Sequence, residues 1–418
     1  MALLMAATPC LALTADEAGA LARRVVAGEA AARAALLEYV ARRDAEAEFA
    51  VAQLVFEGRG FTPDAGQARR LAERAAMRGV AGAQNMLGFF WQHGLGGERD
   101  LTEARRWYEQ AANAGNSNAQ VNLGWLYQEG LGIDPDPARA VQWYEKAAAG
   151  GSAAAMNNLG VLNEAQLRHA GAAADWYEKA AANGVPIAAY RLGRMIEAGN
   201  GRRADAAKAL VYYLKAAAAG IGGAQFAAAR LLDSDTAGPR RPAEALRWFE
   251  AALVSPDAGT SDGFSGLDAA SKAEASYRAG LLRFSPAAGR RDEAAALAHF
   301  RAAARQKHPT AMLRYAQALE RGEGQRADPA QALEWYRRAA ELGDAEALFS
   351  LGRFYEAGLG TPSDARQAMQ YFAKAAEKGH AGAKEMLNSV FGPPPDPSSR
   401  DRAFGAPAPF GSPPAFPR

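Results

Sequence analysis

The segment AQVNLGWLYQEGLG at residues 119–132 decides the fold, because closely similar segments occur twice more along the chain. Residues 83–96 read AQNMLGFFWQHGLG, and residues 347–360 read ALFSLGRFYEAGLG. Each copy has small and apolar residues at helical spacing and ends in a Gly-x-Gly turn. Self-similarity of this kind indicates a repeat protein, so the period of the repeat is the first quantity to establish.

A column of small residues gives that period. Its members follow one another at intervals of 36 residues, except for one interval of 33 and one of 51. The longer interval contains an insertion around Ser255–Leu267. The small-residue column consists of Ala52, Gly88, Gly124, Gly160, Gly193, Ala229, Gly280, Ala316 and Gly352. A second column, 19 residues later in most units, consists of Trp107, Trp143, Trp176, Tyr212, Trp248, His299, Trp335 and Tyr371.

Turn residues divide each unit into two helices. An aspartate such as Asp100 or Asp328 follows the Gly-x-Gly turn and can cap the second helix. A glycine such as Gly151 follows the end of that helix and suits a left-handed C-cap. One helix pair cannot bury its apolar stripe alone, so the units must stack. The sequence therefore predicts an all-α solenoid of about nine helix-turn-helix repeats with a 36-residue period.

The repeat resembles the Sel-one-like repeat family, a relative of the tetratricopeptide repeats. Residues 119–151 carry the resemblance most completely, through Ala119, Leu123, Gly124, Tyr127, Gly130, Gly132, Ala140, Trp143, Tyr144, Ala147, Ala148 and Gly151. Some units depart from the pattern: the first has Leu71-Ala72 in place of the aromatic pair, and the fourth lacks the Gly-x-Gly turn. The resemblance implies a right-handed α-solenoid that acts as an adaptor between proteins.

The ends of the chain differ from the repeats. We predict a solenoid over residues 47–391, an alanine-rich N-terminal capping helix over 16–46 and a proline-rich, disordered tail over 392–418. Residues 1–15 are apolar and end in Leu13-x-Ala15, which resembles a secretory signal and its cleavage site in a bacterial protein. An exported, periplasmic or secreted protein is expected on this basis. The alternative is a cytoplasmic protein, because no Lys or Arg precedes the apolar stretch.

Composition and motifs give no sign of catalysis. The 48 Lys and Arg residues nearly balance the 46 Asp and Glu residues, which gives no reason to expect a nucleic-acid partner. Cys10 is the only cysteine, and the five histidines are scattered over different units. No apolar run is long enough to span a bilayer. The sequence thus predicts no catalytic residue, no metal, no cofactor and no transmembrane span.

Candidate binding residues come from comparing the units. Positions two before and one after the small-residue column lie three apart, so they share a helix face. The resemblance implies that the first helices line the concave surface. The predicted partner-binding residues on this face are Phe89, Asn122, Trp125, Asn158, Arg191, Arg194, Arg230, Arg278, Arg314 and Arg353.

These residue types suit recognition of a peptide. Asn can pair with the backbone of an extended segment, Trp and Arg are frequent hot-spot residues, and Arg can bind carboxylates. We therefore expect a non-enzymatic scaffold that binds a protein or peptide segment, with an acidic partner region facing the arginines. The arginines could instead be solvated or paired with local carboxylates. Two alternative functions stay open: a secreted or host-directed effector that uses the same face and, least favoured, a hydrolase-like enzyme.

Overall fold

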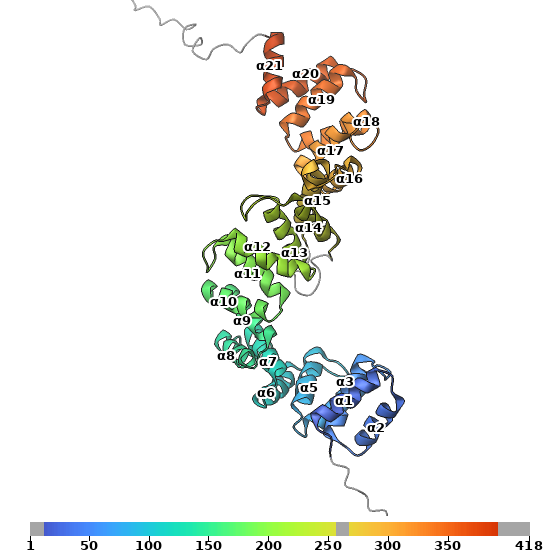
Figure 1. The fold of residues 1–418 in the computed structure, drawn as a ribbon, viewed down its shortest axis with the longest axis vertical. Coiled ribbons are helices and arrows are strands. Elements are labelled where there is room, and N and C mark those ends of the chain that lie inside the picture. The colour runs from blue at the N-terminus through green and yellow to red at the C-terminus, as the bar shows by residue number, and fades with distance from the viewer. Residues whose placement is uncertain (1–11, 256–266, 392–418) are drawn as a thin grey trace, which may run out of the picture. The chain divides into compact units, whose positions relative to one another are not determined.

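The computed structural model describes residues 12–255 and 267–391. Within these residues all regular structure is helical, with 21 α-helices, one short 3-10 helix, η1 (Pro286–Ala288), and no strand. The chain divides into two compact units, the first unit (residues 1–224) and the second unit (residues 225–418). In each unit, helices that follow one another in sequence pack against each other (Figure 1). The predicted all-α solenoid of stacked helix pairs is confirmed.

Nine helix pairs carry the repeat, and one further helix, α21 (Ala381–Phe391), follows them. The first helices of the pairs are α3 (Ala45–Glu57), α5 (Ala81–His93), α7 (Ser117–Glu129), α9 (Ala153–Ala165), α11 (Pro186–Ala198), α13 (Gly222–Leu232), α15 (Ala269–Phe284), α17 (Pro309–Arg321) and α19 (Ala345–Ala357). The second helices are α4 (Ala65–Ala76), α6 (Leu101–Asn113), α8 (Pro137–Ala149), α10 (Ala170–Ala182), α12 (Ala206–Ala218), α14 (Pro242–Val254), α16 (Glu293–Arg305), α18 (Pro329–Glu341) and α20 (Ala365–Glu377).

The N-terminal segment differs from the single capping helix expected over residues 16–46. It forms two helices, α1 (Ala15–Val26) and α2 (Ala30–Ala41). The chain turns between them at Gly28, whose φ of +89° lies in the region that favours glycine. Thr14 and Glu17 cap α1 reciprocally, since each side chain accepts a hydrogen bond from the other residue's backbone N–H. The alanine-rich composition correctly indicated helix but did not predict the turn at Gly28.

The small-residue column is small because an aromatic ring from the second helix packs against it. A Cβ added at Gly124 would lie 2.7 Å from the ring of Tyr144, and one added at Gly88 would lie 2.7 Å from the ring of Tyr108. Both tyrosine rings are fully buried. The two helices of a pair therefore approach closely at this column, and its position fixes which neighbouring residues face outward.

The Gly-x-Gly turns also join successive repeats. Gly132 has a φ of +71°, and a Cβ there would lie 2.8 Å from the Cβ of Leu101, the first residue of α6 in the preceding pair. After the turn, Asp136 caps α8 by accepting a hydrogen bond from the backbone N–H of Arg139 at 3.0 Å. The predicted turn glycines and aspartate caps are confirmed, and Asp100 and Asp328 cap their helices in the same way.

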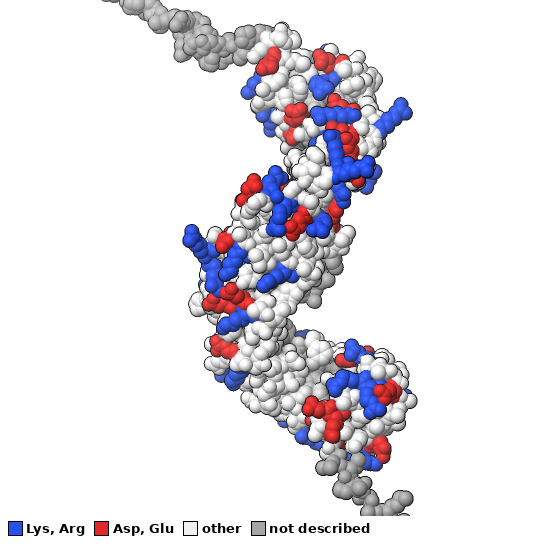
Figure 2. Space-filling view, viewed as in Figure 1, with Lys and Arg blue, Asp and Glu red and all other residues white. Residues whose placement is uncertain are grey.

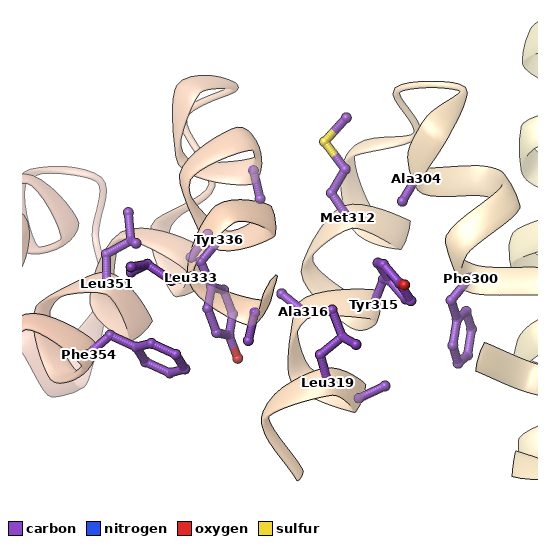
Figure 3. Packing of buried hydrophobic residues seen from close by; sticks show 14 of the residues in the cluster. Phe300, Ala304, Met312, Tyr315, Ala316, Leu319, Leu333, Tyr336, Leu351 and Phe354 are labelled. Carbon is purple, nitrogen blue, oxygen red and sulfur yellow. The ribbon is translucent and has the colours of Figure 1, made fainter. Parts of the chain in front are cut away.

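The core runs through each unit between successive helices. In the second unit, the ring of Tyr336 on α18 meets the ring of Phe354 on α19 edge to face, with centroids 5.2 Å apart (Figure 3). Leu333 and Leu351 come from the same two helices and are buried in the same cluster (Figure 3). Aromatic and leucine side chains thus continue from one repeat into the next.

Three predicted features fall largely or wholly outside the described residues. They are the apolar start of the chain through residue 11, which includes Cys10, most of the insertion (residues 256–266) and the proline-rich tail from residue 392. No helix in the described ranges combines the length and the apolar character needed to cross a membrane.

Candidate functional site

The first helices present the predicted binding columns beside the buried small-residue column. Phe89 and Asn122 are half-buried on α5 and α7, and Trp125 is exposed one residue after Gly124. Arg194 and Arg353 occupy the same column as Trp125 on α11 and α19 and are also exposed. The columns are therefore accessible on most first helices, although Ser350 is buried at its position.

A hollow of about 400 Å³ lies on the first helices α3, α5 and α7 of the first unit. Its apolar lining includes the rings of Phe56 and Phe89, which are in edge contact at 6.2 Å between centroids. Its lining also includes carboxamides, and Asn122 Nδ2 donates a hydrogen bond to Asn85 Oδ1 at 2.9 Å. We call this site the carboxamide hollow; it is lined by Phe49, Gln53, Phe56, Glu57, Gly82, Asn85, Met86, Phe89, Asn116, Asn118 and Asn122. Glu57 is its single charged residue.

The carboxamide hollow brings together two of the ten predicted residues, Phe89 and Asn122. Trp125 and Asn158 belong to neighbouring turns of the same face but do not line it. Asn158 accepts a long hydrogen bond of 3.4 Å from the side chain of Asn157. Asn85 and Asn118 also line the hollow, and the column comparison did not select them because they lie at other offsets from the small-residue column. Gln53 lies one residue after Ala52, at the same offset as Phe89, but was not among the predicted residues.

A second hollow, of about 430 Å³, holds Arg191 and Arg194 on α11. Glu164 and Glu197 also line it, so its cations and carboxylates balance in number. Arg191 donates a hydrogen bond to the Tyr177 hydroxyl at 3.3 Å, and that hydroxyl donates to Glu164 at 2.7 Å. The structure therefore surrounds these two predicted arginines with acidic side chains of the same unit.

The predicted arginines of the second unit are paired in the same manner. Arg278 lies 2.7 Å from Glu274 and 3.7 Å from Asp233. Arg353 lies 3.3 Å from Glu320. Arg230 lies exposed on α13. Basic and acidic side chains also lie next to one another over much of the molecular face in Figure 2.

Arg314 is the most enclosed of these arginines. Its guanidinium lies 2.8 Å from the carboxylate of Glu323, and the two side chains are only 16% and 15% exposed. The rings of Phe284 and Phe300 lie 4.5 and 5.2 Å from the same guanidinium. Arg314 is therefore largely part of the interior of the second unit.

A recurring hydrogen bond links the helices of a pair beneath this face. The buried Tyr108 hydroxyl donates to Gln92 at 2.8 Å, and the Tyr144 hydroxyl donates to Gln128 at 3.1 Å. In each case the acceptor lies four residues after the small-residue column. In three other repeats the acceptors of the equivalent tyrosine hydroxyls are Glu164, Glu197 and Glu320. Burial raises the pKa of Tyr108 and of Tyr144, so both hydroxyls keep their protons at neutral pH.

The histidines of the second unit have structural partners. His308 is the N-cap residue of α17, and its Nδ1 accepts a hydrogen bond from the backbone N–H of Ala311. The other ring nitrogen of His308 lies 2.8 Å from the carboxylate of Glu274. His380 repeats this arrangement with Ala383 and Glu346. In residues 12–255 and 267–391, no group of three or more His, Cys, Asp or Glu side chains is placed to hold a metal ion.

Comparison with known proteins identifies the repeat. Nine segments of the chain match the Sel1 repeat, at residues 45–80, 81–116, 117–152, 153–185, 186–221, 223–253, 273–308, 309–344 and 345–380. Each segment covers all or most of one of the helix pairs described above. Proteins of this family generally act as scaffolds for protein–protein interaction. No curated protein matches the chain.

A solved structure shows the same fold. The chain is similar to a protective antigen of uropathogenic Escherichia coli that displays an SLR fold, with 26% identity and a TM-score of 0.54. That match covers 90% of this chain and 87% of the antigen. A Sel1 repeat protein from Oxalobacter formigenes is 23% identical, with a TM-score of 0.45, and the match covers 88% of this chain and 94% of that protein.

Proposed function

The chain belongs to the Sel1 repeat family, and we propose that it is a non-enzymatic adaptor that binds an extended segment of a partner protein in the carboxamide hollow. The observation that supports this proposal is the composition of the hollow: apolar rings and carboxamides, with one charged residue. Carboxamides both donate and accept hydrogen bonds, as the backbone of an extended peptide does. The rings suit an apolar side chain of that peptide.

Phe89 and Asn122 have different roles in this proposal. Phe89 supplies part of the apolar lining, together with Phe56, which its ring contacts. Asn122 uses one amide hydrogen on Asn85, which leaves its carbonyl oxygen and second hydrogen for a peptide. A ligand would therefore gain apolar burial and backbone hydrogen bonds at neighbouring points, a combination found in peptide-binding sites.

The experiment is a selection of random peptides displayed against the full-length chain. Selected peptides are then titrated against Phe89→Ala, Asn122→Ala and the control Arg353→Ala, which lies on a first helix outside the hollow. We expect the first two substitutions to weaken binding about tenfold or more, the usual range for hot-spot residues, and the control to leave it unchanged. The proposal would be contradicted if no selected peptide lost affinity for Phe89→Ala or Asn122→Ala.

An acidic partner region facing the arginines is the finer form of this proposal. In the second unit such a ligand has to displace carboxylates of the chain itself, such as Glu274 from Arg278. Charge reversal at Arg230 and Arg278 tests it: binding of an acidic partner should fall steeply, while unchanged affinity would eliminate this form. The carboxamide hollow does not depend on the outcome.

We also propose that the protein is exported, on the basis of its apolar start. Cleavage after Ala15 would remove Thr14, which caps α1 in the structure. The intact mass of protein isolated from its own cells tests the proposal. Loss of the first 15 residues is expected, whereas a full-length mass in the cytosolic fraction would place the start of the chain in the N-terminal cap.

A further inference from the structure

Two hollows of the second unit lie at equivalent places in successive repeats, and most of their lining residues belong to the second helices and the turns that follow them. One, of about 460 Å³, lies beside Trp335 on α18, and we call it the Trp335 hollow. The other, of about 490 Å³, lies beside Tyr371 on α20, and we call it the Tyr371 hollow. Trp335 and Tyr371 both follow the small-residue column by 19 residues, so the repeat itself creates these spaces.

The Trp335 hollow combines cations with an apolar wall. Arg305 and Lys307 come from the end of α16, and Arg338 lies over the Trp335 ring with its guanidinium 4.4 Å from the ring centroid. Met312 and Leu342 complete the apolar part, with Leu342 56% exposed, and Glu341 is the one acidic residue that lines the hollow. The hollow thus places three cations and one carboxylate beside a tryptophan and an exposed leucine.

The three cations lack ion-pair partners within the part of the chain that the structure describes. No carboxylate of those residues lies within ion-pair distance of Arg305, Lys307 or Arg338. The neighbouring Arg337, by contrast, lies 2.5 Å from Glu334. The positive charge of the Trp335 hollow is therefore available to a ligand, unlike that of Arg278, Arg314 and Arg353.

Lys307 has an unfavourable backbone conformation for its residue type. Its φ is +62°, in the left-handed region where a side chain is strained. The equivalent position in the other described repeats is glycine, also with positive φ, at Gly79, Gly115, Gly151, Gly184, Gly220, Gly343 and Gly379. This repeat has a cation where its sister repeats have the residue that fits the turn, and strain of this kind is typical of functional positions.

The Tyr371 hollow, at the equivalent place in the next repeat, has different residues at three of these positions. Glu341 stands there in place of Arg305, Gly343 in place of Lys307, and Lys378 in place of Leu342. Two acidic residues, Glu341 and Glu377, accompany its three cations, whereas in the Trp335 hollow Glu341 alone accompanies three cations. The repeat architecture therefore does not require the larger excess of cations or the exposed leucine of the Trp335 hollow.

We propose that the Trp335 hollow is a second docking site, which takes a short acidic peptide segment carrying an apolar side chain. The apolar side chain packs on Trp335, Met312 and Leu342. Carboxylates on either side of it bind the cations Arg305, Lys307 and Arg338, which charge complementarity favours. The site is independent of the carboxamide hollow, so a scaffold with both could hold two partners.

The test uses the full-length chain and a labelled synthetic peptide in which glutamates flank one phenylalanine. Two counterparts replace either the glutamates by glutamine or the phenylalanine by alanine. We expect the first peptide to bind measurably, and each counterpart to bind about tenfold more weakly or worse, since each loses one of the two interactions. No binding of the first peptide, or equal binding of all three, would overturn the proposal.

Substitutions then test whether the peptide binds in the Trp335 hollow. Lys307→Gly should weaken binding about three- to tenfold and raise the unfolding midpoint, because glycine relieves the strained turn. Arg305→Glu combined with Lys307→Gly reproduces residues of the Tyr371 hollow and should abolish binding. Lys374→Gln, in the Tyr371 hollow, is the matched control and should change nothing.

Because Lys307→Gly is expected to be the more stable protein, loss of binding in that variant cannot be attributed to misfolding. Unchanged affinity in Lys307→Gly and in the double variant would overturn the proposal. So would equal competition by a DNA oligonucleotide, which would assign the cations to polyanions in general rather than to an acidic peptide.

Discussion

The first helices α5 and α7 of the first unit and α17 and α19 of the second unit carry different chemistry in the same columns. In the first unit, Phe89 and Asn122 line a nearly uncharged hollow. In the second unit, Arg314 and Arg353 stand at equivalent positions and are paired with Glu323 and Glu320. The comparison teaches that a repeat fixes where a side chain lies, whereas its neighbours decide whether that side chain is available to a partner.

The largest expected effect comes from separating the Arg314–Glu323 pair. Arg314→Ala removes the nearer cation from the carboxylate of Glu323, which is only 15% exposed, and leaves Arg321 at 3.7 Å as its remaining cation. We expect a loss of about 3 kcal/mol in the free energy of unfolding, at the lower end of the range for buried pairs. Asn122→Ala, the equivalent change in the first unit, should cost about 1 kcal/mol or less, because it removes one neutral hydrogen bond.

Urea unfolding of the two variants, followed by circular dichroism, measures this difference. The double variant Arg314→Ala/Glu323→Ala should be less destabilised than Arg314→Ala alone, since it leaves no unpaired charge. If Arg314→Ala were as stable as the wild type, Arg314 would not be a structural residue and the contrast between the units would fail.

The small-residue column should behave alike in the two units. Gly124→Val and Gly352→Val each push a side chain into the ring of Tyr144 or Phe372, and we expect each to cost about 1–3 kcal/mol. Gly171→Val is the control, because a Cβ there meets nothing closer than 3.9 Å. Thermal unfolding of the three variants checks the expectation. A neutral effect at Gly124 or Gly352 would contradict the packing of the column.

A smaller effect is expected for the exposed pair in the second unit. Arg353 is 49% exposed, and its pairing with Glu320 should contribute at most about 1 kcal/mol. Arg353→Ala should therefore lower stability far less than Arg314→Ala, and added salt should remove most of the difference from wild type. Unfolding midpoints at low and high salt measure this. Equal destabilisation by the two substitutions would show that the burial of an ion pair does not determine its contribution to stability here.

The smallest expected effect is a pH dependence of the stability of the second unit, caused by His299. Burial lowers the pKa of His299 below its ordinary value of 6.5, and Arg283 acts in the same direction, while Glu250 at 3.4 Å opposes both. The unfolded chain therefore binds a proton more readily than the folded chain, so His299 contributes stability above pH 6.5 that is lost as the pH falls below it.

His299→Trp restores the residue that most other repeats carry at this position and should reduce the loss of stability on acidification. Unfolding midpoints of the variant and the wild type between neutral and mildly acidic pH provide the measurement. An identical pH dependence in the two proteins would show that His299 does not titrate in this range.

The sequence predicted most of the fold because the repeat left few alternatives. The spacing of Gly88 and Gly124 located the helix pairs, and the turn residues located their ends. The break at Gly28 was missed, since residues 16–46 match no sister repeat with which they could be aligned. One glycine in an alanine-rich segment does not by itself indicate a turn.

The predicted site was harder to assess than the fold. The column comparison selected Phe89 and Asn122, but it could not show that Asn85 and Gln53 complete the same hollow. It also could not show that Arg314 is paired, although the sequence held a signal. Glu323 stands between the glycines of its turn, where Leu95, Leu131 and Leu359 stand in other repeats. Contacts across a turn depend on side-chain direction, which the spacing of residues does not specify.

Photo-crosslinking tests the central claim most directly. A photoreactive phenylalanine analogue is placed at Phe89, in the carboxamide hollow, or at Arg353, on the paired surface of the second unit, in full-length protein made in its own cells. The account predicts that position 89 forms an adduct with one short segment of one partner protein and that position 353 forms none. Adducts at position 353 without any at position 89 would contradict it, because the partner would then bind where the chain's own carboxylates already lie.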